Sequence, residues 1–109
     1  MNEGTYIVDA ARSPIGVKNG KMIGMRPDDL SSEVLKVLLE RNGSNIHSHI
    51  DDVVIGCAFP EGSQGMLMAR GISIMSGVSV EAGAKVVNRF CGSSMDAAHQ
   101  VSQAIESGD

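Results

Sequence analysis

The stretch KVVNRFCGSSMDAAHQVSQAIESGD, residues 85–109, joins an apolar strand pattern to a helix pattern through a corner rich in glycine and serine. Residues 82–90 predict a strand, and residues 94–107 predict a helix that Gly108 closes. One cysteine, Cys91, lies at the corner between them. The stretch therefore predicts a strand–turn–helix unit that carries a thiol at its turn.

Two further strand–helix units are predicted upstream. Residues 5–10 and residues 53–59 have strand patterns, and the second run is apolar throughout, as in a strand covered on both faces. Residues 28–43 and residues 64–79 have helix patterns. The order β-α-β-α-β-α predicts an α/β fold with a mostly parallel sheet and right-handed crossovers.

The first helix pattern follows Pro27, so Asp28 or Asp29 is the expected N-cap, and Gly43 is the expected stop. Its apolar stripe comprises Leu30, Val34, Val37 and Leu38, with Leu35 beside them. In the second helix pattern, the residues that repeat at helical intervals are Met66, Ala69, Ile72 and Met75.

Composition narrows the class of protein. A chain of 109 residues suits one domain at most, and 42% hydrophobic with 20% charged residues is a globular composition. A net charge of −4 argues against nucleic acid and anionic membrane as partners. No apolar run approaches the roughly 20 residues that span a bilayer, and the N-terminus lacks a secretion signal pattern. Two cysteines are too few for a disulfide framework, so a reducing, cytoplasmic setting is expected.

The corner at Cys91 has two readings from its residues alone. The first backbone N–H groups of a helix have no intrahelical partner, so a thiolate placed there is stabilised. The same N–H groups can donate to the oxyanion of a carbonyl that the sulfur attacks, and Gly92 leaves room for that substrate. In the other reading, Cys91 is a small buried hydrophobe, as most isolated cysteines are.

Three motifs favour the first reading. VNRFCGSSMDA, residues 87–97, resembles the active-site signature of the thiolases, the acetyl-CoA C-acyltransferases, and most closely the branch that cleaves 3-ketoacyl-CoA in β-oxidation. YIVDAARSPIG, residues 6–16, and VVIGCAFPEGSQGMLMAR, residues 53–70, resemble other thiolase segments in the same order. The resemblance implies that residues 1–109 are the N-terminal part of a thiolase N-terminal α/β/α domain.

The resemblance also implies a mechanism. Cys91 takes the acyl group as a thioester, its backbone N–H contributes to the oxyanion hole, and the reaction is ping-pong thiolysis or Claisen condensation. Coenzyme A and acyl-CoA are the implied substrates, without a covalently bound cofactor or a metal. The implied assembly of the full-length form is a homo-oligomer, a dimer or tetramer.

The sequence lacks two catalytic motifs of the family's second half, N-x-x-G-G-x-x-A-x-G-H-P and C-x-G-G-G. These motifs supply the histidine that activates the nucleophile and a second cysteine that acts as acid and base. We therefore expect no turnover by this chain alone. The alternative is a non-catalytic thiolase-fold module for binding or assembly.

Two departures from the family pattern, Leu67 in place of asparagine and the small Ala98, read as packing variations. The context of the cysteine disfavours ketoacyl synthases and hydroxymethylglutaryl-CoA synthases.

Other chemistry-bearing residues receive structural interpretations. His99 lies eight residues after Cys91, roughly 12 Å along a helix axis, which is too far for a general base. His47 and His49 are expected to be solvent-exposed rather than metal ligands, and Cys57 is expected in the core. Arg70 could pair with an acidic residue or a partner subunit. The methionines Met66, Met68, Met75 and Met95 could line an acyl channel, although core packing is the favoured interpretation.

Overall fold

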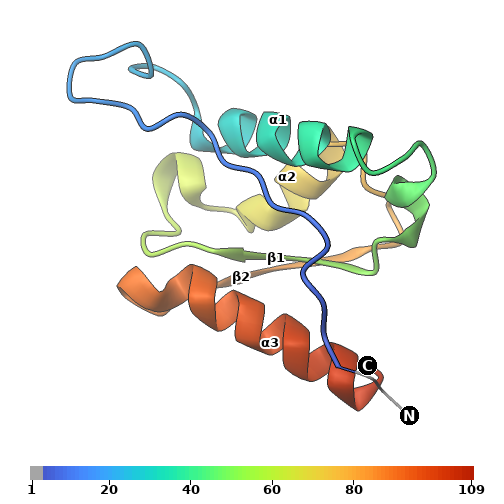
Figure 1. The fold of residues 1–109 in the computed structure, drawn as a ribbon. Coiled ribbons are helices and arrows are strands. Elements are labelled where there is room, and N and C mark those ends of the chain that lie inside the picture. The colour runs from blue at the N-terminus through green and yellow to red at the C-terminus, as the bar shows by residue number, and fades with distance from the viewer. Residues whose placement is uncertain (1–3) are drawn as a thin grey trace.

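The computed structural model describes residues 4–109 as three layers, with a small parallel sheet between helices (Figure 1). Helices α1 and α2 cover one face of the sheet and α3 covers the other. The α/β class expected from the sequence is confirmed. The elements are α1 (Pro27–Glu40), η1 (Ile46–His49), β1 (Asp52–Gly56), η2 (Gly62–Gln64), α2 (Met68–Met75), β2 (Gly83–Val87), η3 (Phe90–Gly92) and α3 (Ser93–Ser107), where η marks a 3₁₀ helix.

Strands β1 and β2 pair in parallel, in a register that runs from Asp52 opposite Gly83 to Gly56 opposite Val87. Their carboxyl ends therefore lie at the same edge of the sheet. The backbone N–H of Cys57 extends the ladder there by donating to the Val87 carbonyl at 2.9 Å. Both strands are shorter than the apolar patterns predicted, because the chain turns away soon after each of these ends.

The strand expected at residues 5–10 is not formed. This segment crosses the molecule beside α1 and α3 without regular structure (Figure 1), and the side chains of Ile7 and Val8 are 92% and 88% exposed. Side-chain contacts hold it near both ends. The Asp9 carboxylate pairs with Arg41 at 2.6 Å and accepts a hydrogen bond from the Asn42 amide at 2.6 Å, and the Thr5 hydroxyl donates to the Ser102 carbonyl at 3.4 Å. A strand pattern supplies only side-chain preference, whereas a strand requires a ladder, and this segment has none within the described residues.

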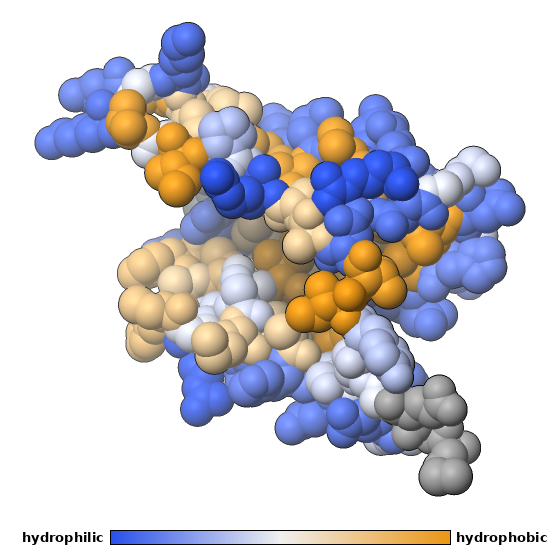
Figure 2. Space-filling view, viewed as in Figure 1, coloured by the Kyte–Doolittle hydropathy of each residue, from blue (hydrophilic) through white to orange (hydrophobic). Residues whose placement is uncertain are grey.

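The segment at residues 5–10 borders a groove instead of filling it. Residues of β1 and α3 line the groove together with it, and Figure 2 shows apolar side chains in the hollow between the α1 layer and the α3 layer.

No helix within residues 4–109 combines the length and hydropathy needed to cross a membrane.

Helix α1 begins one position earlier than expected, because Pro27 occupies its first position and Arg26 is the N-cap. The predicted Asp28 or Asp29 N-cap is therefore wrong. Both carboxylates lie in the first turn instead, where Asp28 binds the Arg26 guanidinium at 2.9 Å. The helix ends at Glu40 with Arg41 as its C-cap, before the expected stop at Gly43.

The buried face of α1 differs from the predicted stripe: Leu39 is 5% exposed, whereas Val37 is 52% exposed. Leu35 contacts both core clusters, which connects them. One cluster comprises Leu39, Val78 and Ala82, and the other comprises Cys57, Met68 and Ile72. The core thus lies between α1, α2 and the sheet.

Helix α2 starts at Met68, four residues later than predicted, because Met66 and Leu67 have φ values of +53° and +55°. Left-handed backbone cannot continue into the preceding residues as a right-handed helix. Ala69 and Ile72 are buried as the pattern predicted, but Met66 is fully exposed. The buried apolar face of α2 therefore begins after Met66, inside the range of residues predicted for this helix.

Candidate active site

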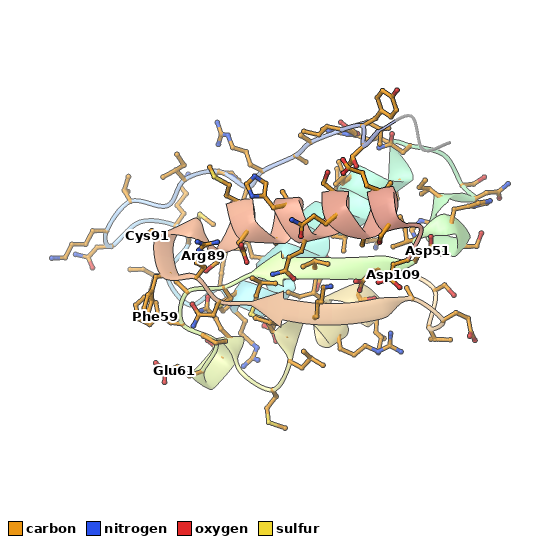
Figure 3. The ribbon with its side chains drawn as sticks, turned by 90° about the horizontal axis from the view of Figure 1, so that it is seen from below. Asp51, Phe59, Glu61, Arg89, Cys91 and Asp109 are labelled. Atoms are coloured by element: carbon orange, nitrogen blue, oxygen red, sulfur yellow. The ribbon has the colours of Figure 1, made fainter. Side chains whose placement is uncertain are left out.

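Cys91 lies at the carboxyl edge of the sheet, between the end of β2 and the start of α3. Figure 3 places it beside Arg89 and near Phe59, and places Asp51 and Asp109 at the opposite end of the molecule. Its thiol is free and exposed. The reading of Cys91 as a buried hydrophobe is therefore wrong, and the predicted strand–turn–helix unit is confirmed, with the 3₁₀ helix η3 as its turn.

The backbone of the corner is bent at Phe90, which has a φ of +44°. The Asn88 side-chain oxygen accepts the Phe90 N–H at 3.0 Å. The Ser93 hydroxyl accepts the Arg89 N–H at 2.9 Å and donates to the Phe90 carbonyl at 2.6 Å. Side chains on both sides of Cys91 thus hold the turn that presents it.

Backbone N–H groups at the corner are less available than the sequence suggested. The Gly92 N–H donates to the Arg89 carbonyl at 3.0 Å, and the Ser93 N–H donates to the Phe90 carbonyl. Within residues 4–109, the Cys91 N–H makes no hydrogen bond. Of these three donors, the one on the cysteine itself remains available to a ligand oxygen beside the thiol.

An ion pair joins the two sides of the corner that carries Cys91. The Arg89 guanidinium contacts the Asp96 carboxylate at 3.0 Å, and the Gln100 amide donates to the same carboxylate at 2.9 Å. The hydrogen bond from Arg89, followed by that from Gln100, holds the pKa of Asp96 below its ordinary value. Asp96 is therefore ionised at neutral pH, and Arg89 is tied to the first turn of α3.

Exposed apolar side chains surround the corner. The Phe59 and Phe90 rings lie 6.4 Å apart between centroids, and both are more than half exposed. Met95 follows Cys91 by four residues and is 70% exposed. The core interpretation of the methionines holds for Met68, whereas Met66 is fully exposed. The thiol therefore has an apolar rim that is not part of the core.

The histidines do not approach Cys91. His47 and His49 belong to η1, which precedes β1 and so lies at the amino ends of the parallel strands, opposite the cysteine. Their Nδ1 atoms contact the carbonyls of Gly77 at 3.0 Å and Asn45 at 2.8 Å, respectively. His99 is an exposed residue of α3. Within residues 4–109, no three histidine, cysteine or acidic side chains are grouped to hold a metal.

The structure also shows where Cys57 and Arg70 lie. Cys57 is buried in the core beside Met68 and Ile72, as expected. Within the part of the chain that the structure describes, Arg70 binds backbone and no acidic side chain. Its guanidinium donates to the carbonyls of Ala82 at 2.7 Å and Val80 at 3.0 Å, so it fixes the turn that leads into β2.

Sequence reasoning missed Gly56, the last residue of β1. A Cβ atom at this position would lie 2.3 Å from the Ser94 nitrogen and 2.4 Å from the Ser93 carbonyl carbon. The end of β1 therefore packs directly on the backbone of the first turn of α3. A glycine at the end of an apolar strand run was the available signal, because it permits close backbone approach.

Comparison with known proteins agrees with this geometry. Residues 5–109 match the thiolase N-terminal domain family. The 3-ketoacyl-CoA thiolase of Shewanella denitrificans is 46% identical over 103 residues, which are 94% of this chain and 27% of that protein. The β-ketoadipyl-CoA thiolase of Acinetobacter baylyi is 40% identical over 95% of this chain and 26% of its own length.

A solved structure shows the same fold. The Acat5 thiolase of Ascaris suum, crystallised with coenzyme A, superposes with a TM-score of 0.80 at 29% identity, over 88% of this chain and 25% of that one. The chain spans about a quarter of the length of these relatives. The match covers every described element and the corner at Cys91, and the chain belongs to the thiolase family, in the region of its N-terminal domain.

Proposed function

We propose that this chain is the N-terminal part of a thiolase acyltransferase and that Cys91 is its acyl-accepting nucleophile. The observation that carries the proposal is the exposed thiol at the carboxyl edge of the sheet, held on a braced corner beside its own N–H, which makes no hydrogen bond within residues 4–109. Ligands of open α/β sheets bind at this edge. The family membership supplies the chemistry that the corner suits.

In the thiolysis direction, the Cys91 thiolate adds to the 3-keto carbon of a 3-ketoacyl-CoA. The bond between C2 and C3 breaks, its electron pair leaves on C2 as the enolate of acetyl-CoA, and the enolate takes up a proton. The acyl group remains on sulfur as a thioester. The thiol of free coenzyme A then loses its proton, attacks the thioester and releases the Cys91 thiolate, so the enzyme returns unchanged.

The Cys91 N–H suits the role of oxyanion donor, because it lies on the residue whose sulfur attacks the carbonyl. Coenzyme A as substrate agrees with the Ascaris relative, which was solved with coenzyme A. A homo-oligomeric full-length form and a cytoplasmic setting belong to the same proposal. The exposed apolar rim at Phe59, Phe90 and Met95 also suits burial against further protein.

Turnover requires a base that takes protons from the thiols, and the three histidines of this chain lie away from Cys91. We therefore propose that the 109-residue chain alone does not catalyse thiolysis. The second candidate, a non-catalytic assembly module, is favoured by the same exposed rim. The mass and sequence of the native gene product distinguish the two, because a continuation with a histidine motif and a second cysteine supports the enzyme.

The experiment combines a thiolysis assay with thiol labelling. The chain is mixed with a 3-ketoacyl-CoA and coenzyme A, and separately with iodoacetamide at neutral pH, with the urea-unfolded chain as reference. We expect no thiolysis, faster labelling of Cys91 in the folded chain than in urea, and protection of buried Cys57. Labelling of Cys91 no faster than in urea contradicts the nucleophile proposal, and thiolysis at the rate of intact thiolases contradicts the missing-base argument.

A further inference from the structure

The residue before the cysteine has a backbone conformation that side chains disfavour. Phe90 has a φ of +44°, in the left-handed region that residues with a Cβ rarely adopt. Such a conformation persists when surrounding contacts determine it, and it is common where a functional side chain must be aimed. The contacts around Phe90 therefore control the direction in which Cys91 leaves the sheet.

Ser93 makes the contacts that span this conformation. Its side chain is buried, and its hydroxyl joins the Arg89 N–H on one side of Phe90 to the Phe90 carbonyl on the other. Asn88 adds a hydrogen bond to the Phe90 N–H, but the Asn88 contact does not reach past the bend. The Ser93 bridge thus connects the end of β2 with the first turn of α3 across the bend, from a buried side chain, whereas the Arg89–Asp96 ion pair that joins the same two segments is formed by an exposed guanidinium.

The backbone of Ser93 is itself held in place by the end of β1. Gly56, at the end of β1, packs on the backbone of Ser93 and Ser94 so closely that a Cβ atom would lie under 3.0 Å from it. The neighbouring serine makes a clear contrast, because the Ser94 side chain has no hydrogen bond within residues 4–109 and the residue is exposed. Of these two adjacent hydroxyls, the one on Ser93 therefore makes the hydrogen bonds that hold the corner.

We infer that Ser93 is a positioning residue for Cys91, because its hydroxyl holds Phe90 in the left-handed conformation that presents the Cys91 thiol and the Cys91 N–H together. The inference rests on the proposed role of Cys91. Ser93 acts through the backbone and does not contact the reacting atoms. Substitution of Ser93 removes the bridge, leaves the Arg89 N–H without its buried partner and frees Phe90 to relax.

The test measures the iodoacetamide labelling rates of Cys91 and Cys57 in the 109-residue chain, by peptide mass, for Ser93→Ala, Ser93→Thr and Ser94→Ala. We expect Ser93→Ala to slow Cys91 labelling by about tenfold toward the rate in urea, while Cys57 stays protected. Ser93→Thr, which keeps a hydroxyl, should restore the rate to within about twofold, and Ser94→Ala should not change it.

Protection of Cys57 separates positioning from general destabilisation, since an unfolding variant exposes both thiols. The inference is overturned if Ser93→Ala labels Cys91 at the wild-type rate, or if Cys57 labelling rises in step with the loss at Cys91. Should Ser93→Ala fail to fold, the pair Ser93→Thr and Ser93→Val carries the test, because the two side chains have the same shape and only threonine keeps the hydroxyl; equal Cys91 labelling in the two then overturns the inference. Wild-type Cys91 that is labelled no faster in the folded chain than in urea contradicts the proposed function instead, so the two failures are distinguishable.

Discussion

Replacement of Gly56 by alanine tests the packing of β1 against α3 at the corner. The added Cβ atom would lie 2.3 Å, 2.4 Å and 2.5 Å from the Ser94 nitrogen, the Ser93 carbonyl carbon and the Ser94 Cα, respectively. All three are backbone atoms, so a rotamer change cannot relieve the overlap. Since carbon atoms pack at about 3.5–4.0 Å, the first turn of α3 must move by about 1 Å or more.

The expected cost follows from two opposing effects. Overpacking of this kind destabilises by about 1–3 kcal/mol, and replacing glycine by alanine returns about 0.4–1 kcal/mol by restricting the unfolded chain. We therefore expect Gly56→Ala to lower the free energy of unfolding by about 1–2 kcal/mol. The displaced turn carries Ser93, so Cys91 labelling should slow as well.

Urea unfolding monitored by circular dichroism measures this change, as a lower midpoint at an unchanged slope. Gly71→Ala is the matched control, because Gly71 lies inside α2, where an added Cβ atom would meet no neighbour within 4 Å, and the substitution should stabilise by about 1 kcal/mol. A Gly56→Ala protein as stable as the wild type, with unchanged Cys91 labelling, would refute the close packing of β1 on the corner.

Three further predictions use the same unfolding measurement. Leu67→Asn should raise the free energy of unfolding by about 1 kcal/mol, because asparagine tolerates the φ of +55° found there; no gain would contradict the left-handed start of α2. Ser73→Ala should leave the free energy of unfolding unchanged or raise it, since the buried Ser73 hydroxyl has no partner within the described residues. Ser76→Ala should lower it by about 1 kcal/mol, because the buried Ser76 hydroxyl donates to the Ile72 carbonyl; the reverse order would contradict this hydrogen-bonding pattern. The hydrogen bond from Arg41 holds the pKa of Asp9 well below its ordinary range, so its stabilisation is present above about pH 4 and is lost as the pH falls through the lowered pKa. Asp9→Asn should therefore be less stable than the wild type at neutral pH and approach it in acid; a difference independent of pH would contradict the ion pair.

Most of the elements were predictable because their signals are local. The helix after Cys91 follows from its apolar spacing and from Gly108, which adopts the left-handed C-cap with a φ of +77°. The parallel pairing of β1 and β2 follows from the helix between them. The position of Cys91 on a strand–turn–helix corner was predictable for the same reason.

The structural features that could not be predicted from the sequence depend on contacts between distant segments. Residues 5–10 have a strand pattern, but whether a ladder forms depends on a partner that the pattern does not name. The close approach of Gly56 to α3 joins residues that lie far apart in the chain. The left-handed Phe90 and the Ser93 bridge set which N–H groups remain available, and neither could be inferred from the Cys-Gly pair.

The central claim is that the corner makes Cys91 an acyl acceptor, and acetyl transfer tests it most directly. The chain is incubated with acetyl-CoA, quenched in acid and digested, and acetyl groups are located by peptide mass, with Cys91→Ser and the urea-unfolded chain as controls. In the transfer, the Cys91 thiolate attacks the thioester carbonyl and the coenzyme A thiolate leaves. We predict acetylation of Cys91 in the folded chain, with none on Cys57 and none on Cys91 in urea; an unacetylated Cys91, or equal acetylation in urea, would contradict the account.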